Sequence, residues 1–151
     1  MTYASAEARQ ELLSEVALAI EELSRSIAAV GEAYDAVDER MADRLEEELF
    51  RPLQGAYAAA TRTYAGFAAR HELPGRRFAP APAPAPHGVR SLVEDAVDTA
   101  VHADQILTDL QDSLAPVEVG DPELRQGLAD VRRRLGEIPA RADGLIRVLG
   151  R

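Results

Sequence analysis

The chain has 151 residues, of which 46% are hydrophobic, and it carries a net charge of −9 at pH 7 without any cysteine. The missing thiols exclude disulfides, thiolate metal sites and cysteine nucleophiles. A chain this acidic is repelled by nucleic acid and by anionic lipid, so we expect no nucleic-acid partner and no membrane. The N-terminus lacks a basic segment followed by an apolar core, and we therefore expect no signal peptide and a cytoplasmic location.

The first part of the chain follows the spacing of an amphipathic helix. Ser5 can cap its start, and apolar residues then recur every three or four positions along one face. These residues are Leu12, Val16, Ile20, Leu23, Ile27, Val30 and Tyr34.

Residues 31–38 can be interpreted in two ways. Gly31 can end the first helix and Asp38 can cap a second one. Alternatively, Val37 and Leu45 continue the same apolar stripe, and a single long helix extends to residue 50. We favour the turn, because it gives helices of similar length, as a bundle requires.

The next helix is expected to end near residues 69–72. Its inward residues are Leu45, Leu49, Leu53, Ala56, Ala60, Tyr64 and Phe67. Pro52 lies inside it, removes one backbone hydrogen bond and clashes with the preceding turn, so we expect a kink or a break there.

Residues 72–88 form a proline-rich linker between residues 1–71 and residues 89–151. Its centre, residues 79–86, alternates alanine and proline and favours an extended polyproline II strut. About 16 such residues span roughly 50 Å, enough to follow a whole helix. The linker thus permits an overhand connection or an exchange of halves between two chains.

The second half predicts two more helices. The third helix covers residues 89–114, and Pro116 is expected in the loop that follows. Its inward residues are Leu92, Ala96, Ala100, Ala103, Leu107, Leu110 and Leu114. Asp121 and Pro122 have the order of an N-cap and a first helical residue. The fourth stripe comprises Leu128, Val131, Leu135, Ile138, Leu145 and Leu149, with a second kink expected at Pro139.

Four amphipathic segments without any period-two pattern predict an all-α fold. We expect a four-helix bundle built from two helical hairpins, residues 1–71 and 89–151, joined by the Ala-Pro linker into a single domain. The first half could instead be one long kinked helix.

Four aromatic residues recur at helical spacing: Phe50, Tyr57, Tyr64 and Phe67. They lie among alanines, and the simpler interpretation is that they are the largest core residues. The alternative is a pocket for a flat apolar ligand, with the tyrosine hydroxyls at its rim.

Catalytic and metal-binding motifs are missing from the sequence. A two-metal carboxylate bundle needs Glu-x-x-His on two helices, and none of the three histidines has an acid three positions before it. We expect all of them to be exposed, His102 on a solvated face with Asp95 and Asp98. The acidic residues at positions 35–48 lack the loop of a calcium hand, so we interpret them as a solvated face.

Our leading hypothesis is a non-enzymatic bundle that acts through protein–protein association, most simply as a homo-oligomer, without a cofactor. The alternative is a small-ligand binder that uses the aromatic face from Phe50 to Phe67. A carboxylate metal-binding bundle is the remote third hypothesis.

Overall fold

The computed structural model describes residues 2–85 and 88–149, and in these residues the chain is helical except for short turns and one extended linker. The elements are α1 (Thr2–Asp35), α2 (Glu39–Leu45), the π-helical turn η1 (Glu46–Phe50), α3 (Arg51–Arg70), α4 (Val89–Asp112), α5 (Ala115–Val119), α6 (Pro122–Gly136) and α7 (Ile138–Leu149). The described residues contain no strand. The predicted all-α class is confirmed.

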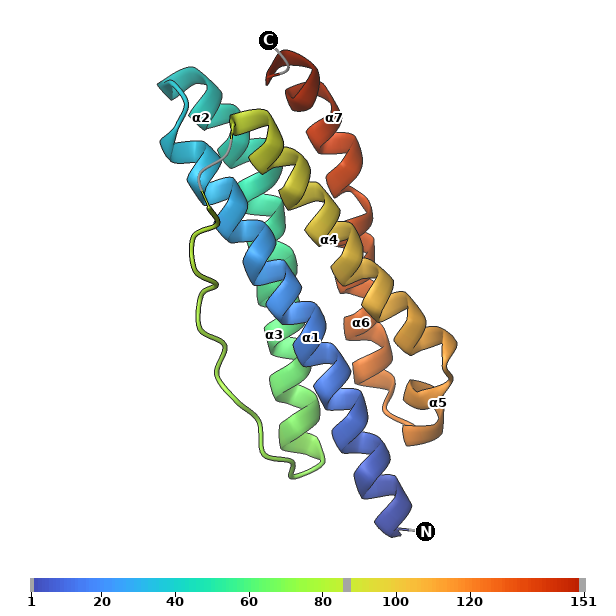
Figure 1. Cartoon of the computed structure of the whole chain (residues 1–151). Coiled ribbons are helices and arrows are strands. Elements are labelled where there is room, and N and C mark those ends of the chain that lie inside the picture. The colour runs from blue at the N-terminus through green and yellow to red at the C-terminus, as the bar shows by residue number, and fades with distance from the viewer. Residues whose placement is uncertain (1, 86–87, 150–151) are drawn as a thin grey trace.

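The helices form a bundle of four rods, namely α1, α2 to α3, α4, and α6 to α7 (Figure 1). α1 packs against α3 and α4, and α6 packs against the same two helices. α1 and the α6–α7 rod run upward in Figure 1, whereas α3 and α4 both run downward. Every packed pair around the bundle is therefore antiparallel, although α3 and α4 are consecutive long helices.

The first turn of the chain lies at residues 36–38, inside the predicted window of 31–38. Asp38 caps the helix that follows, because its side chain accepts a hydrogen bond of 2.9 Å from the Met41 N–H. Gly31 lies inside α1 and does not end it. The interpretation of residues 4–50 as one uninterrupted helix is wrong.

Both internal prolines coincide with an irregularity, as predicted. Pro52 is the second residue of α3, just after η1, where the Arg51 N–H bonds to the Glu46 carbonyl five residues back. This wider turn takes up the change in hydrogen bonding that the missing proline N–H imposes on an otherwise continuous rod. Pro139 is the second residue of α7, after a break at Glu137.

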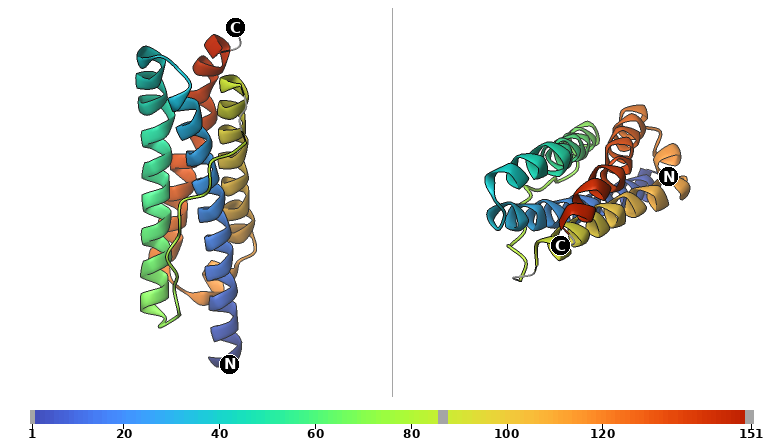
Figure 2. Two further views of the ribbon diagram at one scale, coloured as in Figure 1. Left: turned by 60° about the vertical axis from the view of Figure 1, so that its left-hand side comes forward. Right: turned by 90° about the horizontal axis from the view of Figure 1, so that it is seen from above.

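The linker makes an overhand connection within one chain. It starts at the lower end of α3, runs up the bundle beside α3 and α1, and reaches the upper end of α4 (Figures 1 and 2). Glu72 has a φ of 52° and the Leu73 N–H bonds to the Ala68 carbonyl, so the chain leaves α3 through a Schellman-type turn. Farther along, the Ala81 N–H donates to the Ser24 Oγ of α1 at 2.8 Å.

The core follows the predicted stripes with corrections. Every inward residue expected of the second helix is buried, and so are those of the third helix except Leu114. Leu114 is 59% exposed, because α4 ends at Asp112 and the chain turns there. Pro116 lies in the short helix α5 and not in a loop. The buried face of α1 also differs from the predicted stripe. Tyr34 is exposed, whereas Ser26 is buried and its hydroxyl donates a hydrogen bond to the Ala96 carbonyl.

Candidate functional site

The four predicted aromatic residues do not converge on one site. Phe67 is fully buried and contacts the His71 ring at a tilt of 50°, with the ring centroids 4.5 Å apart. Phe50 lies more than four turns away, where η1 meets α3, and is edge-on to Tyr34 of α1 at 6.2 Å. The structure therefore separates these two from any common pocket.

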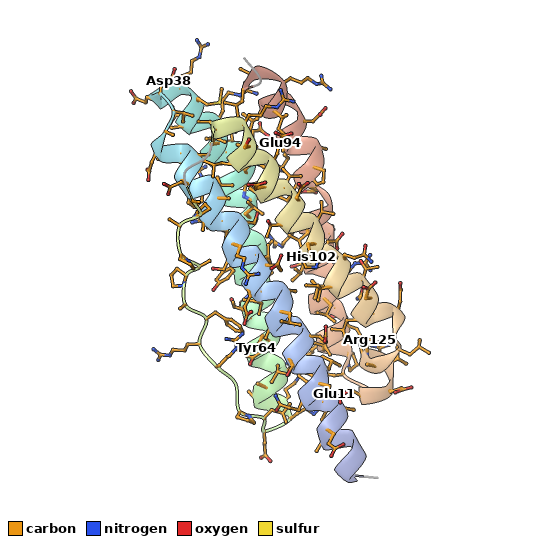
Figure 3. All side chains as sticks on the ribbon, in the orientation of Figure 1. Glu11, Asp38, Tyr64, Glu94, His102 and Arg125 are labelled. Atoms are coloured by element: carbon orange, nitrogen blue, oxygen red, sulfur yellow. The ribbon has the colours of Figure 1, made fainter. Side chains whose placement is uncertain are left out.

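Tyr57 and Tyr64 do share a surface hollow of about 380 Å³. The Tyr64 ring is 6% exposed and meets Phe78 of the linker edge-on at 5.0 Å (Figure 3). The other lining residues are Thr61, Ala65, Arg76, Arg77 and Phe78. The linker thus supplies one wall of this hollow, which the sequence could not indicate.

A polar cluster that the sequence analysis missed joins the end of α3 to the start of α6. The carboxylate of Asp121 accepts two hydrogen bonds from Arg70, at 2.9 and 3.0 Å. The His71 Nε2 lies 2.8 Å from the same carboxylate, and the Leu124 N–H donates to it at 2.9 Å. The expectation that His71 is exposed is wrong, since only 17% of its side chain is accessible. His87 lies outside the described residues.

Hydrogen bonds stabilise the ionised form of the Asp121 carboxylate in this cluster. Burial by itself would raise the pKa of Asp121, but the hydrogen bonds from Arg70, the Leu124 N–H and His71 outweigh burial and lower the pKa to about 2. No nucleophile accompanies the histidine and the carboxylate among these contacts. We therefore interpret the cluster as a clamp between two helices.

The remaining polar candidates are exposed. His102 is on a solvent-exposed face, as predicted, but its Nδ1 lies 2.8 Å from the Glu22 carboxylate of α1 (Figure 3). Within residues 2–85 and 88–149, no group of three or more histidine or acidic side chains is placed to hold a metal ion. No helix in the same residues is both long enough and apolar enough to span a membrane.

The lower end of the bundle carries an unusual apolar surface around α5. Leu114 and Val117 are 59% and 54% exposed. Leu114 has a φ of 67°, the left-handed region that glycine usually occupies after a helix. Pro116, between them, is buried and holds α5 against the bundle.

A hollow of about 630 Å³ lies between α1, the end of α4 and α5, and from this segment Ser113, Ala115 and Glu118 line it. Its apolar lining consists of Ala8, Leu12, Leu110 and Ala115, and its acidic lining of Glu7, Glu11, Glu15 and Glu118. We call this hollow, together with the exposed Leu114 and Val117, the α5 surface. The beginning of α1 projects beyond the rest of the bundle at this end, with Glu11 on its side (Figures 1 and 3).

The four carboxylates of the α5 surface have no arginine partner among the described residues. No basic side chain lines the hollow either. The surface therefore combines an apolar floor with negative charge that the described residues leave unneutralised.

Comparison with known proteins gives no relative: no family model, no curated protein and no solved structure matches this chain.

Proposed function

We propose that this chain is a non-enzymatic helical bundle that acts by binding another protein through the α5 surface. The observation that carries the proposal is Leu114, a bulky apolar residue that is 59% exposed at a φ of 67°. A glycine there would avoid both the backbone strain and the exposed apolar surface, each of which costs stability. A leucine at such a position contributes favourable free energy only if a partner covers its side chain.

Val117 supports the same conclusion independently of the backbone. It is exposed on the helical turn that follows Leu114, and the chain neighbours of the two residues, Ser113, Ala115 and Glu118, line the hollow at the end of α4. Exposed apolar side chains beside an apolar hollow are the usual mark of an interaction site, whereas scattered ones are ordinary. Val148, which is 52% exposed at the other end of the bundle, has no neighbour in the chain that lines either of the hollows described above.

Our leading hypothesis from the sequence, a homo-oligomer, provides the first test of this surface. The homo-oligomer predicts a mass that rises with concentration, and contact through the α5 surface predicts that Leu114→Ser with Val117→Ser abolishes the rise. Light scattering measures the mass, and circular dichroism checks that the helix content is unchanged.

A partner of another kind is detected by placing a photo-crosslinking residue at position 117, with position 148 as the matched control. We expect a discrete crosslinked species from position 117 only. A protein that stays monomeric at every concentration and gives the same crosslinks from both positions would contradict the proposal.

The Tyr57–Tyr64 hollow favours a second candidate function, the binding of a small flat ligand. Two tyrosines and Phe78 provide aromatic faces, and Arg76 and Arg77 would add affinity for an acidic group. Because the chain has no tryptophan, its fluorescence reports on tyrosine. Quenching by an aromatic carboxylate that Tyr57→Leu abolishes would support this function. Quenching that is insensitive to this variant would contradict it.

A further inference from the structure

We propose that the occupant of the α5 surface is a positively charged amphipathic helix of another protein. This inference rests on the proposed function and goes further, because it specifies the chemistry of the partner. It follows from the shape of the surface, from its charge and from the repulsion that a second copy would meet.

The shape favours a helix. The hollow is an open groove bordered by α1 on one side and by α5 and the end of α4 on the other. Such a groove accepts an amphipathic helix whose apolar residues recur at positions i, i+3, i+4 and i+7. Leu12 and Leu110 would lie beneath these residues, and Leu114 and Val117 would extend the apolar contact beyond the groove.

The charge selects a basic partner. Glu7, Glu11 and Glu15 follow one another at helical spacing along α1 where it lines the groove, and Glu118 of α5 lines the same groove. Covering these carboxylates with a neutral or acidic segment would remove water from unpaired charges, which is unfavourable. Lysine or arginine on the flanks of a bound helix would neutralise them and would speed its association.

The same carboxylates disfavour a second copy in a face-to-face dimer. A two-fold contact would bring the four glutamates of one chain against those of the other, and like charges across an interface reduce affinity. Residues 1–50, which include three of these glutamates, carry 13 acidic residues and 4 arginines, so the opposing surface would supply little compensating charge.

The test uses the full chain and a fluorescent model peptide of about five helical turns, made of leucine and lysine at amphipathic spacing. The matched control peptide replaces every lysine with glutamate. Fluorescence anisotropy measures the dissociation constant. We expect binding of the lysine peptide only, and weaker binding as the ionic strength rises.

Two variant pairs locate the binding site. Leu114→Ser with Val117→Ser should weaken binding by about tenfold or more, because it removes apolar contact area. Glu11→Gln with Glu118→Gln should weaken binding by roughly three- to tenfold. The matched controls, Val148→Ser and the pair Glu39→Gln with Asp43→Asn, make equivalent changes at the opposite end of the bundle and should leave binding unchanged.

Other outcomes would overturn the inference. Equal losses from the control variants would mean diffuse attraction between opposite charges. Failure of the lysine peptide to bind, combined with a dimer that Leu114→Ser and Val117→Ser dissociate, would identify a second copy as the occupant and would leave the proposed function intact. Failure of both peptides to bind a monomeric protein would also reject the inference, and crosslinking at position 117 then decides whether the α5 surface binds a partner of different chemistry.

Discussion

Deleting residues 81–86 of the linker should convert the protein to a larger oligomer. The rod that the linker must follow contains α2, η1 and α3, with 7, 5 and 20 residues. At about 1.5 Å per residue it is roughly 48 Å long. Residues 72–88 span about 50 Å in polyproline II geometry, so the linker has almost no slack.

The deletion removes about 19 Å of this span, and the residues that remain reach about 40 Å even when fully extended. The chain could then no longer place α4 beside its own α1. Since both halves must still bury their apolar faces, each half should pack on the other half of a neighbouring chain. The helix content should stay nearly the same, because residues 81–85 lie outside every helix.

Light scattering at several concentrations measures the mass of the deletion variant and of the parent protein, and far-UV circular dichroism measures the helix content. The matched control replaces residues 81–86 with six glycine and serine residues, which keeps the contour length and should keep the parent mass. An unchanged mass in the deletion variant would refute the reasoning, because it would mean that α4 can reach its place by a shorter path.

Four other substitutions test the packing and the charges. Gly127→Ala should lower the free energy of unfolding by about 1–3 kcal/mol, because a Cβ at this position would overlap the Thr63 side chain. At Gly31 an added Cβ meets nothing within 4 Å, so Gly31→Ala should raise the free energy of unfolding by about 0.5–1 kcal/mol. Equal effects of the two substitutions in urea unfolding would contradict the close approach of α3 and α6. Leu114→Gly should stabilise the protein by about 0.5–1 kcal/mol, because glycine adopts a φ of 67° without strain; a lower unfolding temperature would show that the leucine contributes to the core. Asp121→Asn should lower the free energy of unfolding by about 2 kcal/mol at pH 7, because the folded pKa of about 2 lies below the ordinary value of 3.8. That stabilisation is present above pH 3.8 and is lost as the pH falls toward 2, so the difference between the variant and the parent should shrink over this range; a difference independent of pH would contradict the assigned pKa.

Features set by a few neighbouring residues could be predicted from the sequence. The apolar spacing predicted the helices, Asp38 and Asp121 predicted two helix starts, and Pro52 and Pro139 marked the two interruptions. Such features follow from local backbone geometry and from hydrogen bonds that span three or four residues. These helix starts and interruptions therefore do not depend on how the rest of the chain packs.

The errors arose where local spacing gave more than one answer. The apolar stripe appeared to continue through Leu114, but Ser113 caps α4 and the next residue turns outward. The aromatic residues had the right spacing for a common face, yet Phe67 entered the core while Phe50 met α1. A helical position defines a direction around the rod, and only the neighbouring rods decide whether that direction is buried.

The sequence by itself determined an all-α chain of amphipathic helices with an extended proline-rich linker. Only the tertiary structure decided that the linker runs the length of the bundle and that His71 meets Asp121, 50 residues away. It also placed α5 beside the start of α1, which created the α5 surface. The physical reason is that these contacts join residues distant in the chain, and their partners depend on how all four rods pack.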